Sequence, residues 1–447
     1  MSDRQIRLGL LAHPYGYHPS AWLKTSAPAD AATNIDYYRQ LASLAEQGLF
    51  DLFFLADTPA ARTEKLNVHC RNPDFMNRFE PITLLSALAG ATKHIGLGGT
   101  ASTSFYEPYN IARLFASLDH LSHGRAAWNI VTSANDYAAR NYGLDKLPAH
   151  DERYVRAMEF YRVVESLWNT WEDDAFVYDK EACVNFVPEK FHVTDHSGKY
   201  FKVYGGLNIK RTPQGRPVII QAGSSEVGKQ FAAETAEVVF ASDPTLPAAQ
   251  KFYADLKGRV TQFGRDPDSL KVLAGLSVVV GDSEAEAQDK YQELQRMIHP
   301  DVGLMRLGAD LEVDLSGLPL DEPVPEELIP KKANFHQAYF NQIANSIREK
   351  KLTLRQLYSS YERGKVTLCG TPSQITDHMM EWIEGDAADG FMLGFHLQLE
   401  DLAGFVEKVV PEMQRRGVYR DRYVGSTLRD HLGLERPVHR GAVTAAA

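Results

Sequence analysis

Cysteine, long apolar runs and excess positive charge are all scarce in this sequence. The 447 residues contain three widely spaced cysteines, which suits a reducing compartment and excludes a disulfide framework. No run approaches the ~20 apolar residues that a membrane-spanning helix needs, and the N-terminus shows no export signal. The formal net charge of −10 argues against nucleic acid or an anionic membrane as the main partner. We therefore expect a cytoplasmic globular protein.

Several catalytic motifs are absent as well. The sequence contains no H-E-x-x-H and no C-x-x-C, so we expect no metal site. The glycines at 96, 98 and 99 do not complete G-x-G-x-x-G, which leaves a Rossmann dinucleotide site unsupported. The lack of G-x-S-x-G weakens the hydrolase interpretation.

The sequence does contain a regular alternation of short apolar runs and amphipathic segments. Eight strands are predicted, at 6–12, 51–56, 94–102, 125–132, 218–220, 237–241, 271–280 and 390–396. The segments between them predict helices, most clearly at 151–171, where apolar residues recur three or four apart. This order predicts an α/β fold, a (β/α)8 TIM barrel, with a doubly wound sheet as the alternative.

Two stretches interrupt the alternation. We expect a single barrel domain over residues 1–436, with insertions at about 173–216 and 299–370 and a flexible tail at 437–447. The insertions are candidates for a lid and for substrate selection.

The turn after the fifth strand carries the first functional signal. PVIIQAGSSE, at 217–226, joins a buried strand to a helix through small residues. Backbone N–H groups and the helix dipole there favour an anion, and Ser224 and Ser225 add hydroxyls, which indicates a phosphate site. One alternative is a P-loop formed by Gly223, Gly228 and Lys229, but Gln230 replaces its magnesium-binding hydroxyl. The other is an ordinary turn in which a serine caps the helix.

The carboxyl ends of the other strands supply further candidates, because ligands bind there in both folds considered. Polar side chains at or near these ends include His13, Tyr15, Asp57, Thr100, Thr103 and Asn129. Each also has a structural interpretation, as a loop cap or as a satisfied core residue. His150 and Tyr154 lie four apart at the start of the long helix, with Asp151 as its expected N-cap, so the imidazole and the phenol would share one face.

Five runs resemble the bacterial luciferase-like flavin monooxygenases. They are DLFFLADT (51–58), EPYNIARLFASLDHLSHGRAAWNIVTS (107–133), HDERYVRAMEFYRVVESLW (150–168), HSGKYFKV (196–203) and PVIIQAGSSEVGK (217–229). The resemblance is strongest to the nitrilotriacetate, dibenzothiophene-sulfone and pristinamycin synthase component A group. It spans most of the chain and implies a TIM-like barrel.

The resemblance also implies a reaction. A separate NAD(P)H:flavin reductase would supply reduced FMN, and O2 would then oxygenate a small organic substrate through a C4a-(hydro)peroxyflavin. Some members cleave a C–N or C–S bond. Homodimers or homotetramers are usual in the family. The chemistry belongs to the cofactor, so we assign no catalytic residue.

The cofactor-binding residues that the resemblance implies are those found at the strand ends, at the phosphate turn and at the start of the long helix. Asp57 would lie beside the flavin, Thr103 or else Thr100 would contribute from the third strand, and Asn129 would approach the isoalloxazine. The ribityl phosphate would be held by His150, Tyr154 and Ser225, with help from Ser224. His13, Tyr15 and Trp22 are candidates for the substrate side, with loop packing as the alternative.

Three other functions stay open from the sequence. The first is an ATP-dependent enzyme that uses the P-loop-like turn, which Mg²⁺-dependent ATP binding would reveal. The second is a non-catalytic flavin-binding barrel, which would bind FMN without consuming substrate. The third is a deazaflavin-dependent oxidoreductase on the same fold.

Overall fold

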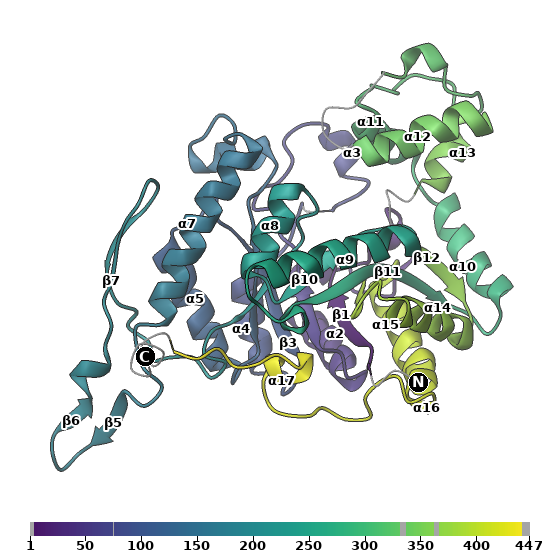
Figure 1. Cartoon of the computed structure of the whole chain (residues 1–447). Coiled ribbons are helices and arrows are strands. Elements are labelled where there is room, and N and C mark those ends of the chain that lie inside the picture. The colour runs from purple at the N-terminus through teal and green to yellow at the C-terminus, as the bar shows by residue number, and fades with distance from the viewer. Residues whose placement is uncertain (1–3, 75, 331–336, 362–365, 440–447) are drawn as a thin grey trace.

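Eight parallel strands form a closed barrel in the computed structural model, which describes residues 4–74, 76–330, 337–361 and 366–439 (Figure 1). Neighbouring strands pair in sequence order around the barrel, and β1 closes it by pairing with β13. The strands are β1 (Arg7–Leu11), β2 (Leu52–Leu55), β3 (Gly96–Ser102), β4 (Ala126–Val131), β9 (Val218–Gln221), β10 (Val238–Ala241), β11 (Lys271–Val280) and β13 (Gly390–Leu393). All eight predicted strands and the predicted TIM barrel are confirmed.

Helices surround the barrel, and most of them match the predicted segments. They are α2 (Ile35–Gln47), α4 (Pro81–Ala89), α5 (Pro108–Leu121), α7 (His150–Trp168), α8 (Glu226–Thr235), α9 (Leu246–Gln262), α10 (Glu284–Arg296) and α14 (Pro372–Glu384). Two short helices, α1 (Ala21–Lys24) and α3 (Leu66–His69), lie in the segments that follow β1 and β2. Among the described residues, no helix is long and apolar enough to cross a membrane.

The closing helical segment, over residues 398–415, is not one continuous α-helix. It consists of α15 (Gln398–Gly404), a π-helical turn at Phe405–Val409 and α16 (Val410–Arg415). Pro411 has no N–H to donate, and its ring would collide with the carbonyl four residues earlier. A π-turn, which widens the helix locally, accommodates such a residue.

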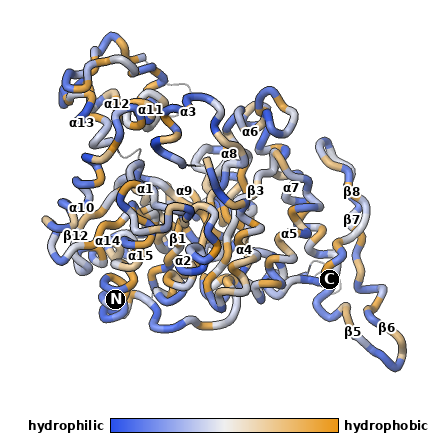
Figure 2. Tube along the Cα trace, turned by 180° about the vertical axis from the view of Figure 1, so that it is seen from behind, coloured by the Kyte–Doolittle hydropathy of each residue, from blue (hydrophilic) through white to orange (hydrophobic). Residues whose placement is uncertain are grey.

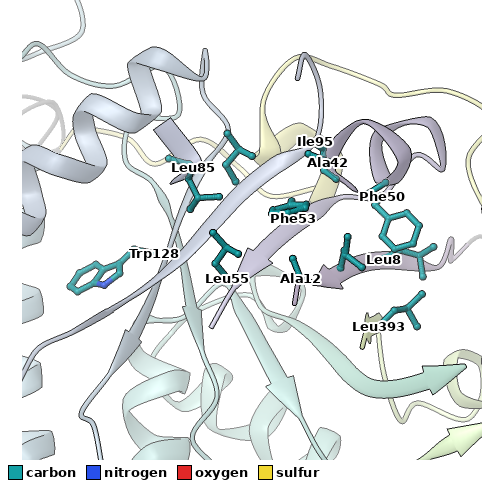
Figure 3. Close-up of a cluster of buried hydrophobic side chains, with 14 of the residues drawn as sticks. Leu8, Ala12, Ala42, Phe50, Phe53, Leu55, Leu85, Ile95, Trp128 and Leu393 are labelled. Atoms are coloured by element: carbon teal, nitrogen blue, oxygen red, sulfur yellow. The ribbon is translucent and has the colours of Figure 1, made fainter. Parts of the chain in front are cut away.

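The core follows the alternation of side chains along each strand. Leu52 and Phe54 of β2 belong to the cluster inside the barrel. Phe53 and Leu55 belong instead to the large cluster between the strands and the helices. Figure 3 shows the second cluster, with Phe53, Leu55 and Trp128 among its labelled members. Strands buried on both faces explain the near-continuous apolar runs in the sequence.

A short C-terminal helix, α17 (Leu428–Leu432), closes the end of the barrel where the strands begin (Figure 1). Leu428 and Leu432 join the cluster inside the barrel. Between them, Arg429 donates from Nη1 to Glu237 Oε1 at 2.7 Å and from Nη2 to Glu237 Oε2 at 3.0 Å, and both side chains are buried. Glu237 immediately precedes β10, so this ion pair links α17 to the barrel wall. We call α17 the plug helix.

The first insertion forms two hairpins that extend away from the barrel (Figure 2). The first pairs β5 (Phe176–Asp179) with β6 (Val184–Phe186), and the second pairs β7 (Thr194–Ser197) with β8 (Lys202–Gly205). The second hairpin is fixed to the outer face of α7, where Glu159 accepts hydrogen bonds from the backbone N–H groups of Tyr200 and Phe201.

The second insertion is mainly helical and has its own apolar core. It includes α11 (Pro300–Leu311), α12 (Gln337–Lys350) and α13 (Leu354–Ser360). An additional strand, β12 (Thr367–Gly370), pairs with the second half of β11 and was not predicted from the sequence. Its four residues are mostly half-buried and therefore give little apolar signal.

The C-terminal segment also differs from its prediction. A flexible tail was expected from residue 437, yet the Pro437 carbonyl accepts a hydrogen bond from Arg211 at 2.7 Å, and His439 is buried. Residues 440–447 lie outside the described part of the chain.

Candidate functional site

The predicted site residues gather along one arc of the barrel rim. Asp57 follows β2, Thr100 lies in β3 and Asn129 lies in β4, and these three strands are neighbours. The register places Thr100 directly beside Asn129. The next strand around the barrel is β9, which leads to Ser224 and Ser225. These segments therefore lie along one continuous part of the barrel wall.

Thr100 and Asn129 form a polar pair on the inner face of the barrel. Asn129 Nδ2 donates to Thr100 Oγ1 at 2.9 Å, and both residues are 5 % exposed. Asn129 Oδ1 is buried and has no hydrogen-bond partner among the residues described. A buried amide oxygen without a partner costs about 1–3 kcal/mol, so its position indicates a ligand that donates a hydrogen bond to it.

Thr103 was the preferred threonine from the sequence, but its environment favours Thr100. The Thr103 hydroxyl donates to the carbonyl of Val131 at 3.2 Å, and the residue is almost fully buried. Three positions separate the two threonines, so the alternation of a strand places them on opposite faces. Thr100 shares the inner face with Asn129.

Asp57 provides a carboxylate with altered acidity. Burial raises the pKa of Asp57 to about 6; the neighbouring Glu80 adds to the rise and Arg78 opposes it. Removing a carboxylate from water disfavours its charged form. Asp57 therefore has a stronger tendency than an ordinary aspartate to hold a proton or to accept hydrogen bonds from a ligand.

The N-terminus of α8 forms a small cradle. Ser225 caps the helix by accepting a hydrogen bond from the N–H of Gly228 at 3.1 Å. The hydroxyl of Tyr154, from α7, lies against the same turn. A Cβ added at Gly223 or Gly228 would lie only 3.0 or 2.9 Å from that hydroxyl oxygen. The two glycines thus allow the phenol to approach the helix end, where backbone N–H groups attract anions.

His150 lies next to Tyr154 at this cradle. Its ring lies 5.1 Å from the ring of Tyr154, measured between centroids, and its side chain is 48 % exposed. The expected N-cap, Asp151, is instead inside the first turn, because α7 begins at His150 and Ala149 occupies the cap position. The Asp151 carboxylate lies 2.8 Å from His150 Nδ1. Ser224 is exposed beside the turn.

The residues predicted for the substrate side have different roles in the loop after β1. His13 Nε2 lies 3.0 Å from Asp74 Oδ1, and the ring is buried. Tyr15 and Trp22 instead use their polar atoms within the loops, because Tyr15 donates to the carbonyl of Ala29 and Trp22 to that of Arg71, each at 2.9 Å. His13 Nδ1 also accepts hydrogen bonds from the N–H groups of Tyr15 and Gly16, so all three residues use polar atoms in contacts within the loops.

A second buried cluster lies on the opposite side of the rim. His18, Tyr291 and His396 have ring centroids within 6.3 Å of one another. His396 follows β13, and its Nε2 lies 3.1 Å from Thr367 Oγ1. The strand-end rule points to His396, but nothing in the sequence connects it with Tyr291 on α10.

The P-loop alternative has no support from the position of its lysine. Lys229 lies on α8, with its ammonium paired to Asp255 of α9 and Glu226. These carboxylates hold the lysine away from the turn, so it cannot serve as a phosphate-binding lysine in this arrangement.

The residues present fit a phosphorylated heterocycle such as the flavin expected from the sequence. An anion cradle lies at α8, and an inward-facing amide and a carboxylate lie on neighbouring strands at the same rim. An amide oxygen accepts from a ring N–H, and a helix N-terminus suits a phosphate.

Comparison with known proteins places the chain in a family. The family model described as luciferase-like monooxygenase matches residues 16–389. The N-acetyl-S-(2-succino)cysteine monooxygenase of Bacillus subtilis (strain 168) is 46% identical over 98% of this chain and 99% of its own length. Nitrilotriacetate monooxygenase component A of Aminobacter aminovorans is also 46% identical, over 98% of each chain.

A solved structure supports the same assignment. A riboflavin lyase crystallised with modified FMN and riboflavin is 31% identical, with a TM-score of 0.84, over 98% of this chain and 99% of that chain. The chain belongs to the luciferase-like monooxygenase family, and it is a flavin-dependent monooxygenase.

Proposed function

We propose that this chain is the oxygenase component of a two-component system that uses reduced FMN and O2 to oxygenate a small organic substrate. A separate NAD(P)H:flavin oxidoreductase supplies the reduced flavin. The observation that supports FMN, rather than a flavin without phosphate, is the convergence of Tyr154, Ser225 and two close-approach glycines on the N-terminus of α8. The name of the 46%-identical relative from Aminobacter aminovorans, a component A, supports a partner component.

Each group of residues has a defined task in this proposal. The hydroxyls of Tyr154 and Ser225 and the imidazole of His150 hold the phosphate. Thr100 and Asn129 fix the flavin ring from inside the barrel, and Asp57 accepts a hydrogen bond at the rim. When bound, reduced flavin supplies the electrons that activate O2. The protein contributes orientation and the exclusion of water.

The second insertion is the proposed cover of this site. Its helix α11 contacts α3, in the segment that follows β2, and Arg71 Nε lies 3.6 Å from Asp301 Oδ2. The hairpins of the first insertion contact α7 and the C-terminal segment, so we assign them no lid role. Unchanged protease sensitivity of residues 299–330 with and without FMN would contradict closure.

The phosphate cradle is tested by comparing FMN with riboflavin, which lacks the phosphate. Under anaerobic conditions, Ser225→Ala and His150→Ala should each weaken binding of reduced FMN by about 10–100-fold, because a hydrogen bond to a charged group contributes about 1.5–3 kcal/mol. Riboflavin affinity should stay within about threefold of wild type. The measurement is equilibrium titration by flavin absorbance or fluorescence.

Ser283→Ala is the matched control for this experiment. Ser283 caps α10 by accepting a hydrogen bond from the N–H of Glu286 at 3.2 Å. Losing either cap costs about 1 kcal/mol of stability, but only Ser225→Ala should alter FMN binding. Equal losses for FMN and riboflavin would place the phosphate elsewhere, and no binding of any flavin would overturn the proposed function.

Gly228→Ala tests the close approach of Tyr154. The added methyl group would lie 2.9 Å from the Tyr154 hydroxyl oxygen and 3.0 Å from Ser225 Oγ, so it should displace both and weaken FMN binding by about tenfold. Gly258→Ala, in α9, is the control, since nothing lies within 4 Å of its added Cβ. That control should raise stability by about 0.5–1 kcal/mol and leave FMN affinity unchanged.

Turnover experiments distinguish the related functions. Oxygen consumption with reduced FMN, a reductase and a panel of small amines and thioethers should show a substrate-dependent increase. Flavin binding with no substrate-dependent turnover across the panel would favour a non-catalytic flavin-binding barrel. Turnover supported only by a reduced deazaflavin would favour a deazaflavin-dependent oxidoreductase. A homodimer or homotetramer is the expected state, which light scattering would measure.

A further inference from the structure

Two neighbouring parts of the chain and the distant C-terminal segment meet beyond the C-terminal end of α7. Glu172 follows that helix, His192 precedes β7, and His439 belongs to the C-terminal segment. Each of the three side chains offers one ligand atom, and these atoms lie within 4.8 Å of one another. Within the described part of the chain, this is the one group of at least three histidine, cysteine or acidic side chains placed so closely.

The individual contacts already resemble those of a metal site. His192 Nε2 lies 2.8 Å from Glu172 Oε1, and the rings of His192 and His439 have centroids 5.1 Å apart. His439 Nε2 lies 2.9 Å from the carbonyl oxygen of Asn169. A ring N–H donated to a backbone carbonyl is the usual support for a metal-binding histidine, because it fixes the tautomer and the ring orientation.

The C-terminal segment is held in place independently of these ligands. Asp173 Oδ2 pairs with Arg211 at 2.7 Å and with Arg436 at 3.0 Å, and Arg211 also donates to the carbonyl of Pro437. These bonds position His439, so a metal would not have to order the segment by itself. The single carboxylate of Asp173 neutralises one of the two positive charges that Arg211 and Arg436 carry.

We propose that Glu172, His192 and His439 bind a zinc ion, with water as the fourth ligand. Two imidazoles and a carboxylate are ligands that zinc accepts in tetrahedral geometry. Zinc–ligand bonds of about 2.0–2.1 Å place neighbouring ligand atoms about 3.3 Å apart. Glu172 and His192 are already closer than this. The site therefore requires a contraction of at most about 1.5 Å, and the partly exposed Glu172 and His192 side chains can move.

The position of the site indicates a structural ion. Helix α7 begins with His150 at the proposed flavin phosphate site and ends beside the cluster. The helix is 19 residues long. At about 1.5 Å per residue, this is roughly 28 Å, so the ion would not contact the substrate. It would cross-link the first insertion to the C-terminal segment.

The test uses full-length protein without a histidine tag, treated with a chelator and then titrated with zinc by calorimetry. Wild type should bind one zinc ion per chain. His439→Ala and Glu172→Gln should each weaken that binding at least about 100-fold, since loss of a mere supporting partner costs 10–100-fold. Glu172→Gln retains a hydrogen-bonding group and should fold normally, which circular dichroism would verify.

His120→Ala is the matched control. The His120 ring also lies within hydrogen-bonding distance of a backbone carbonyl, that of Lys210, at 3.0 Å, but it is not part of the cluster. It should leave zinc affinity unchanged. Cobalt bound in place of zinc should give the visible absorption of a tetrahedral site, lost in His439→Ala. Absence of zinc binding by wild type, or affinity unaltered by His439→Ala or Glu172→Gln, would overturn the proposal.

Discussion

Glu237→Gln should lower the free energy of unfolding by about 3–5 kcal/mol, because it leaves buried cations without their anion. Glu237 is 6 % exposed and pairs with Arg429 of the plug helix and with Arg216, whose Nη1 lies 2.9 Å from Glu237 Oε2. The same carboxylate accepts from the N–H of Ile219 at 3.0 Å. Denaturant unfolding followed by circular dichroism measures the loss.

The pH dependence of stability identifies the same carboxylate. Burial alone would raise the pKa of Glu237, but Arg216 and Arg429 outweigh burial and lower it from 4.5 to about 2. A depressed carboxyl pKa gives stability that is complete above pH 4.5 and is lost as pH falls towards 2. As pH falls through this range, the difference in free energy of unfolding between wild type and Glu237→Gln should disappear.

Glu234→Gln is the control for the buried ion pair. Glu234 also pairs with an arginine, Arg162, at 3.3 Å, but Arg162 is 65 % exposed. Exposed pairs contribute little, so this variant should change the free energy of unfolding by less than about 1 kcal/mol. Similar losses in both variants would show that the plug is not anchored by Glu237.

Asp57→Asn should make the protein more stable and less active. The pKa of Asp57 is raised from 3.8 to about 6, first by burial and then by Glu80. The folded protein therefore binds the proton more tightly than the unfolded chain, and the charged form reduces stability as pH rises through this window. At pH 8 the variant should gain about 1–2 kcal/mol, a value that allows for partial solvation of the side chain.

The gain should vanish well below pH 3.8, where the carboxyl is protonated in both states. Turnover with reduced FMN should fall at least tenfold, because the flavin loses a charged hydrogen-bond acceptor. Thermal unfolding over a pH series and oxygen consumption measure the two effects. Asp243→Asn is the comparison, since burial also raises the pKa of Asp243, which follows β10 outside the proposed arc. Equal activity in wild type and Asp57→Asn would remove Asp57 from the site.

The barrel could be predicted from sequence because its strands are buried on both faces. Runs such as LFFL and VIIQ are apolar at nearly every position, and each precedes a segment with helical periodicity. β12 could not be predicted from the sequence because it is short and only partly buried. The π-turn depends on how Pro411 is accommodated by its surroundings, which local propensity does not encode.

The candidate site was predictable in composition but less so in orientation. Ligands bind at the carboxyl ends of the strands, which points to Ser225 and Asn129, and helix periodicity points to Tyr154. The structure brings the three residues to one rim. The choice between Thr100 and Thr103 depends on which face of β3 points inward, and the glycines of that strand give no apolar alternation to reveal it. His18, Tyr291 and His396 meet only through tertiary contacts.

The closure of the barrel has a consequence for how the chain is made. β1 is synthesised long before its partner β13 and the helix α17. Until then β1 has one unpaired edge, and the lower end of the barrel interior is open to water. Such late, non-local pairing slows folding and exposes apolar edges. Nascent chains of this enzyme should therefore depend on chaperones until β13 and α17 have emerged, and protease resistance should appear only after that point.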